Sequence, residues 1–291
     1  MKRYVSLEEI SDGKLYTAND MVRADCLGCK GCSKCCHAMG DTILLDPCDI
    51  WRFQKGLGLG AQELLAEGKI ALRVVDGVIV PHMKMQPVSE PGQAVRQSIG
   101  GPGQTLRQPI GGPDQAVRQS IGGPGQAVRQ PIGGQGQTLR QPVTDQKAGQ
   151  EVSAGEGEEK CPFLDDAGWC TIHEHRPGLC RLFPLGRYYE GEGFRYFLQK
   201  SECDHPKAKV KVSQWLGIPE LAKYEEYVLT WHRIQKQAEE LQKENGDETF
   251  ARNLNMFLLK TFFLLPYDGE NDFYPQFERR LLDYRKIVPE A

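Results

Sequence analysis

The sequence predicts an α+β fold with two hairpins and a helical C-terminal third around a small cysteine-rich core. Nine of the ten cysteines fall into two groups on either side of a low-complexity tract, which indicates that the tract interrupts one domain. Two pairs of apolar runs flank Gly-containing turns, as in β-hairpins. Beyond residue 218, apolar side chains recur at three- and four-residue spacing, which is typical of packed helices.

Composition favours a cytoplasmic protein with reduced thiols. No apolar run approaches the roughly 18 residues that a membrane-spanning helix needs, and the N-terminal MKRYVSLEEI lacks the apolar stretch of an export signal. The net charge is −3 at pH 7, although residues 91–143 carry five Arg and one Asp. The body of the chain is therefore mildly acidic, so we expect no nucleic-acid partner and no membrane partner.

The first cysteine group reads CLGCKGCSKCC and consists of Cys26, Cys29, Cys32, Cys35 and Cys36. In a C-x-x-C turn both sulfurs can face one point, which suits a soft cation such as zinc. Lys30 and Lys34 lie between the thiols and would offset the negative charge of thiolates. Since neighbouring side chains diverge, Cys35 and Cys36 are expected to point in different directions, so that they serve two centres or only one binds.

Other uses of these thiols are less favoured. A structural disulfide would need an oxidising compartment, for which the N-terminus gives no sign. A thioredoxin-like redox motif needs a single C-x-x-C rather than three overlapping ones. Inert buried thiols remain an alternative, but the spacing favours a metal or cluster site.

The second cysteine group consists of Cys161, Cys170, Cys180 and Cys203. A turn at Asp166–Gly168 should bring Cys161 and Cys170 back toward each other. Nine thiols suffice for two four-ligand sites with one spare, or for one cluster with several spares. Cys48 lies on a predicted helix and is expected to be a buried core residue.

Several other side chains are candidates for supporting roles. Arg176 and Arg181 flank Cys180, and guanidinium groups would offset the charge of a thiolate cage. Four histidines lie near the cysteines in sequence: His37, His173, His175 and His205. Any one of them could replace a missing thiol, although a supporting or surface role is favoured for each.

Spacing leaves the choice between zinc and an iron–sulfur cluster, including a 4Fe–4S cluster, open. Paired C-x-x-C elements fit zinc, and closely spaced cysteines with a distant one also fit iron–sulfur clusters. The C-x3-C-x2-C motif of radical S-adenosylmethionine enzymes is absent, because Met39 stands where its third cysteine would be.

The remaining elements follow from local signals. Ser6 begins a short helix, Ile43–Leu45 is a short buried strand, and Asp46 caps a helix over 47–54 that has Pro47 at its first position. The glycines of 56–61 separate this helix from one over 61–67. Hairpins are predicted at Asp76-Gly77 and at Gly191-Glu192, and C-terminal helices over 219–243, 248–264 and 272–285.

Between the cysteine groups, residues 91–143 repeat an 11-residue unit that begins PGQAVRQSIGG. The Gly and Pro of each copy disfavour a continuous helix, and the short apolar islands bury too little surface to offset the entropy of ordering. We expect residues 86–160 to be a disordered insertion. Residues 1–85 and 161–205 would then form one discontinuous metal-binding domain, on which the helices of 206–291 pack.

The sequence contains three motifs: C-x-x-C-x-x-CC, then CPFL followed by a cysteine, then I-H-x-x-R-P-x-x-C-R-x-F-P. Together they resemble the YkgJ-type cysteine-cluster family. This family is also called the CxxCxxCC zinc- or iron-chelating domain, and it is distantly related to flagellin lysine N-methylases. The resemblance covers about 25–85 and 161–205. The resemblance implies that the positions matching the family motifs bind metal, namely Cys29, Cys32, Cys35, Cys36, Cys161, Cys170 and Cys180. Spacing and chain position add Cys26 and Cys203 as candidate ligands.

The leading hypothesis is a zinc- or iron–sulfur-binding protein of unassigned reaction, whose centre joins the two cysteine segments. One alternative is a cluster-dependent enzyme, either a protein lysine N-methyltransferase or an oxidoreductase. Another is an interaction module in which zinc is structural and the C-terminal helices dock a protein partner.

Overall fold

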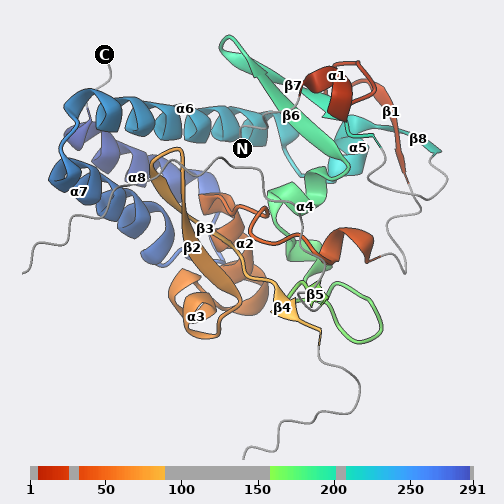
Figure 1. The fold of residues 1–291 in the computed structure, drawn as a ribbon, viewed down its shortest axis with the longest axis horizontal. Helices are drawn as coiled ribbons and strands as arrows, with labels where there is room; N and C mark the ends of the chain where they lie inside the picture. Colours follow the sequence, from red (N-terminus) through yellow and green to blue (C-terminus); the bar gives the residue numbers. More distant parts are fainter. Residues whose placement is uncertain (1–5, 26–32, 89–157, 201–207, 289–291) are drawn as a thin grey trace, which may run out of the picture. The chain divides into compact units, whose positions relative to one another are not determined.

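The computed structural model describes residues 6–25, 33–88, 158–200 and 208–288 (Figure 1). These residues combine helices with two-stranded antiparallel sheets, which confirms the α+β class. All of them belong to one compact unit that joins the segments before and after residues 89–156. Within these ranges, no helix has the length and apolar character to cross a membrane.

The N-terminal part begins with helix α1 (Leu7–Ile10), and its capping box confirms the predicted start at Ser6. Strand β1 (Met21–Asp25) then pairs with β8 (Ala208–Lys211), which continues into helix α5 (Val212–Leu216). These three elements were not predicted. Helix α4 (Gly178–Leu182) and the hairpin of β6 (Leu185–Glu190) and β7 (Gly193–Leu198) pack with them around a small core. This core is made of Val22, Ala24, Leu182, Leu185, Tyr196, Val212 and Leu216.

Helix α2 (Pro47–Leu57) begins as predicted, with Asp46 accepting a hydrogen bond from the Asp49 backbone N–H at 3.0 Å. Its C-terminal cap is Gly58 in the left-handed region, and α3 (Ala61–Ala66) follows the glycine break. The predicted strand over Ile43–Leu45 is reduced to a single β-bridge, from Leu44 to His82.

Both predicted hairpins are present. Strands β2 (Ile70–Val75) and β3 (Val78–Met83) meet at Asp76-Gly77, where both residues have positive φ. Strands β6 (Leu185–Glu190) and β7 (Gly193–Leu198) meet at Gly191-Glu192.

The C-terminal third is helical, as predicted, with α6 (Leu221–Asn245), α7 (Glu248–Leu259) and α8 (Phe273–Ile287). Helix α7 continues into a π-helical turn, η4 (Lys260–Leu264). Their aromatic side chains form the main core, where Trp231 contacts Phe262 and Tyr227 meets the edge of Phe277. The prediction that these stripes are core is therefore confirmed.

The two ends of the predicted insertion are ordered, which corrects its boundaries at 86 and 160. Strand β4 (Gln86–Pro87) pairs with β5 (Glu159–Lys160), and the two lie side by side in Figure 1. The Val88 backbone N–H also donates to the Glu158 carbonyl oxygen at 2.6 Å. Backbone pairing holds these ends together, while residues 89–157 lie outside the described part.

Candidate metal centre

The two cysteine segments are joined by backbone hydrogen bonds. A 3-10 turn, η2 (Lys34–Cys36), ends the first segment, and the Cys161 N–H donates to the Cys36 carbonyl oxygen at 2.7 Å. Two residues on, the Ala38 N–H donates to the Glu159 carbonyl oxygen at 2.9 Å. This pairing places the end of the first cysteine run beside the first cysteine of the second group.

The loop between Cys161 and Cys170 folds back on itself, as predicted. Leu164 forms a β-bridge with Cys170, and the Asp165 N–H donates to the Trp169 carbonyl oxygen at 3.0 Å. The Asp165 carboxylate closes the turn by accepting the Trp169 N–H at 2.7 Å. Two cysteines nine residues apart in the sequence are thereby brought to neighbouring positions.

This loop is anchored to the main core by Phe163, which is buried and stacks on Phe53 with ring centroids 5.7 Å apart. Phe53 lies on α2. The packing fixes the cysteine loop against the helix, so the loop position depends on the same core that orders the C-terminal helices.

Cys180 lies on helix α4 (Gly178–Leu182), which follows a 3-10 turn, η3 (His173–His175). The Gly178 N–H donates to Asp49 Oδ1 at 2.8 Å, and Asp49 also pairs with Arg52 at 2.9 Å. A side chain at position 178 would place its Cβ 2.4 Å from the Tyr224 hydroxyl oxygen, so the close approach requires glycine. These contacts set the position of Cys180.

Five described thiols lie in the neighbourhood of this junction: Cys35, Cys36, Cys161, Cys170 and Cys180. The pKa of Cys35 is raised first by a hydrogen bond with the Cys36 thiol and then by burial. Those two thiols therefore lie near each other. Whether they serve one centre or two stays a prediction.

The pKa values of Cys161 and Cys180 are also shifted by neighbouring thiols. Burial raises the pKa of Cys161 to about 11, and the nearby thiols of Cys170 and Cys35 add to the shift. Burial also raises the pKa of Cys180 well above its usual value, followed by the effects of Cys161 and Cys35. As uncoordinated groups, these thiols hold their protons, because desolvation and mutual repulsion both disfavour thiolates.

Backbone amides and one guanidinium group lower the pKa of two of these thiols and so oppose the effect of burial. Cys161 accepts a hydrogen bond from the Phe163 N–H and Cys170 from the Ile172 N–H, and both bonds lower the thiol pKa against the larger effect of burial. The charge of Arg176 also lowers the pKa of Cys170. Both cysteines thus receive an N–H from the residue two positions later, an arrangement that stabilises sulfur ligands carrying negative charge.

Positive charge accumulates on one side of the thiols. Burial lowers the pKa of Arg181 to about 10, and the neighbouring charges of Arg52 and Arg176 lower it further. Among the residues described, Arg176 Nε is a buried donor that lacks a hydrogen-bond partner. Negative charge near Arg176 and Arg181 would reduce the repulsion between the guanidinium groups.

The predicted histidines occupy different environments. His37 forms a β-bridge with Lys160, and its buried Nδ1 has no hydrogen-bond partner within the described ranges. His173 contacts an Arg176 amino group through Nε2 at 3.0 Å. The His175 ring lies so close to Gly56 that a Cβ there would stand 2.2 Å from it. His205 lies outside the described residues.

The other predicted ligands divide into two sets. Cys26, Cys29, Cys32 and Cys203 lie outside the described residues. Cys48 is buried in the main core at 3% exposure, as expected, and its backbone N–H donates to the Tyr227 hydroxyl. In the described part of the chain, no three His, Cys, Asp or Glu side chains stand in an arrangement that would already hold a metal ion.

Sequence reasoning missed the groups that position Cys180. Asp49 is 1% exposed and joins the Arg52 side chain to the N-terminus of α4. Its spacing after Asp46 indicates a capping box. Its hydrogen bond to the Gly178 N–H, however, depends on α4, which is remote in sequence. Only the folded chain reveals it.

Comparison with known proteins identifies one family. Residues 133–205 match the family model described as "CxxCxxCC: Putative zinc- or iron-chelating domain". The match contains all four cysteines of the second group, and the first group precedes it. No curated protein and no solved structure matches the chain.

Proposed function

We propose that this chain binds a thiolate-held metal centre, either zinc or an iron–sulfur cluster, because residues 133–205 match the model of the CxxCxxCC zinc- or iron-chelating domain. The proposed ligands are Cys35, Cys161, Cys170 and Cys180. The observation that supports this proposal is the backbone hydrogen bond of 2.7 Å from the Cys161 N–H to the Cys36 carbonyl oxygen, which joins the two cysteine segments. The thiols of Cys35 and Cys161 also both raise the pKa of Cys180. Four thiolates are the ligand set of structural zinc and of 4Fe–4S clusters.

The chemistry of the surrounding groups supports this assignment. A metal replaces the thiol protons, so the desolvated thiols with raised pKa become bound thiolates. The Phe163 and Ile172 N–H groups already donate to sulfur, and Arg176 brings positive charge to Cys35 and Cys170. When bound, zinc would cross-link the two segments, and an iron–sulfur cluster would add one-electron chemistry.

The remaining cysteines have subsidiary roles in the proposal. Cys36 lies next to Cys35, whose pKa it raises, and is the candidate to exchange with it as a ligand. Cys26, Cys29, Cys32 and Cys203 stay predicted ligands, either of a second centre or as spares.

Quantification of zinc, iron and acid-labile sulfide in protein purified without oxygen tests the proposal. We expect about one zinc per chain and no sulfide, or about four iron with about four sulfide. A broad visible absorption would accompany the second result. Protein that is folded by circular dichroism but contains neither metal would overturn the proposal.

A pair of matched variants assigns the centre to these thiols. Cys170→Ala removes a proposed ligand, and we expect it to lose most of the bound metal. Cys48→Ala removes a thiol that is more deeply buried but lies in the apolar core, and its metal content should equal that of the wild type. Equal metal loss in both variants would indicate that general destabilisation, rather than ligation, is responsible.

A further inference from the structure

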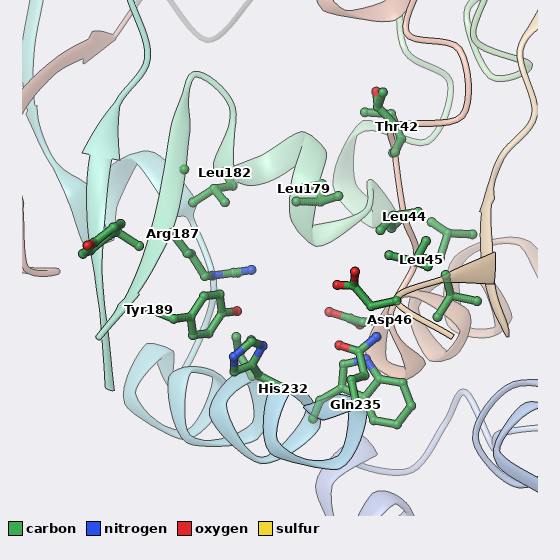
Figure 2. Close-up of a pocket in the computed structure, with 18 of the residues that line it drawn as sticks. Thr42, Leu44, Leu45, Asp46, Leu179, Leu182, Arg187, Tyr189, His232 and Gln235 are labelled. Carbon is green, nitrogen blue, oxygen red and sulfur yellow. The ribbon is translucent and has the colours of Figure 1, made fainter. Parts of the chain in front are cut away.

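A second candidate site is a cavity of about 730 Å³ that no described cysteine lines. Figure 2 shows it between α4, the β6–β7 hairpin, α6 and the segment before α2. Its walls are largely apolar, and their side chains include Leu44, Leu45, Val78, Leu179, Leu182 and Trp231. This volume lies within the range of small-molecule sites, which typically combine apolar walls with a few polar groups.

A basic and an acidic side chain face each other across this cavity. In Figure 2 the Arg187 guanidinium enters from β6, and the Asp46 carboxyl enters from the opposite wall at the start of α2. Arg187 donates to the Tyr224 hydroxyl at 3.3 Å, but its buried Nε has no partner among the described residues. Asp46 accepts the Asp49 N–H through Oδ1.

The other buried charges on the wall are already paired within the protein. Asp49 is bonded to Arg52 at 2.9 Å, and Glu239 is held by Lys236 at 2.5 Å and by Lys243 at 2.6 Å. These pairs neutralise each other locally. The charges of Arg52 and Arg187 act on Asp46, and Arg187 lies over the Phe194 ring. Among the described residues, however, neither Asp46 nor Arg187 forms a close ion pair like that of Asp49 with Arg52. Both groups can therefore still pair with a ligand.

The floor of the cavity adds polar and aromatic contacts. The Tyr189 and His232 rings stack with centroids 3.8 Å apart, and Gln235 follows His232 by one turn of α6. A stacked aromatic pair offers a flat apolar face, and the amide offers both a donor and an acceptor.

We propose that this cavity binds a small zwitterion with an apolar body, of the amino-acid or short-peptide class. The ligand carboxylate would pair with Arg187, its ammonium group would pair with Asp46, and its side chains would contact the leucine-rich walls. A guanidinium suits a carboxylate because its donors form a planar fork. Only a molecule with both charges satisfies both walls, since a buried charge left unpaired is costly.

Isothermal titration with three forms of one dipeptide tests this inference. The probes are L-leucyl-L-phenylalanine, its N-acetyl derivative and its C-terminal amide. We expect the zwitterion to bind and each blocked form to bind at least about tenfold more weakly, which is the effect of losing one charged hydrogen bond. No binding of the zwitterion at millimolar concentration, or equal binding of either blocked form, would overturn the inference.

Variants locate the binding within this cavity. Arg187→Gln and Asp46→Asn should each weaken binding of the zwitterion about tenfold or more. Arg195→Gln, on the paired strand β7, and Asp247→Asn, at the cap of α7, make the same changes outside the cavity and should leave affinity unchanged. An affinity that falls equally in the control variants would contradict the assignment.

The test is independent of the metal centre. Metal per chain should be the same in wild type and in Arg187→Gln, because Arg187 is not among the proposed ligands. If fully metallated protein does not bind the dipeptide, the cavity proposal alone is refuted. If protein purified without oxygen contains no metal but still binds the dipeptide, only the metal proposal is refuted.

Discussion

Asp46 combines a structural role with an electrostatic cost. Its carboxyl caps α2, yet burial raises its pKa to about 7, and the negative charge of Asp49 adds to the shift. The folded-state pKa therefore exceeds that of the unfolded chain, so the native state binds more protons between about pH 4 and 7. The contribution of this carboxyl to stability consequently falls as pH rises through that range.

Replacing Asp46 with Asn should remove this cost, because Asn is an equally good helix cap. We expect the free energy of unfolding of Asp46→Asn, measured by urea denaturation, to exceed that of wild type at pH 8 by about 1–2 kcal/mol, a figure discounted for solvent in the cavity. The difference should shrink toward pH 4. A difference that is constant with pH, or that grows toward acid, would contradict this account.

At the scale of elements, α4 connects the two candidate sites. Cys180 faces the thiols, whereas Leu179 and Leu182 of the same helix line the cavity. The helix has only five residues, so external contacts must hold it. Asp49 supplies such a contact at Gly178, and Arg52 in turn balances the charge of Asp49.

Asp49→Asn should therefore destabilise the protein and weaken the metal centre. Loss of one partner leaves Arg52 buried without its counter-charge, which costs about 3 kcal/mol. Metal affinity, measured by competition with a chelator, should fall about tenfold or more, as when other groups that support ligands are removed. The double variant Asp49→Asn/Arg52→Met should regain stability; if it is no more stable than Asp49→Asn, the Arg52 charge is not the cause.

Elements with strong local signals were predictable. Asp76-Gly77 fixes a hairpin because both residues adopt positive φ, and Asp46-Pro47 marks a helix start. Strands β1 and β8 carried no such signal, since Val22 pairs with Val210, which follows it by more than 180 residues. The pairing of the Cys36 and Cys161 segments could be inferred from cysteine spacing. The cavity could not, because Asp46, Arg187 and His232 come from three separate elements.

For the whole molecule, we expect folding to proceed without the repeat tract, because the sequence predicts that the tract is a disordered insertion. Strands β4 and β5 already hold residues 88 and 158 within hydrogen-bonding distance, at 2.6 Å. A chain in which a short Gly/Ser turn replaces residues 89–157 should therefore fold with unchanged metal content and a Tm within a few degrees of wild type. Loss of metal or of cooperative unfolding in this variant would show that the tract belongs to the domain.

The central claim is that thiols from both cysteine segments bind one centre, and X-ray absorption at the metal edge tests it most directly. For a zinc centre we predict about four sulfur neighbours near 2.3 Å, and for an iron–sulfur cluster an all-sulfur shell. In either case, Cys35→Ala and Cys170→Ala should each lose metal or lower the sulfur count, while Cys48→Ala leaves the spectrum unchanged. A shell dominated by nitrogen and oxygen, or one altered by only one of the two segment variants, would contradict the account.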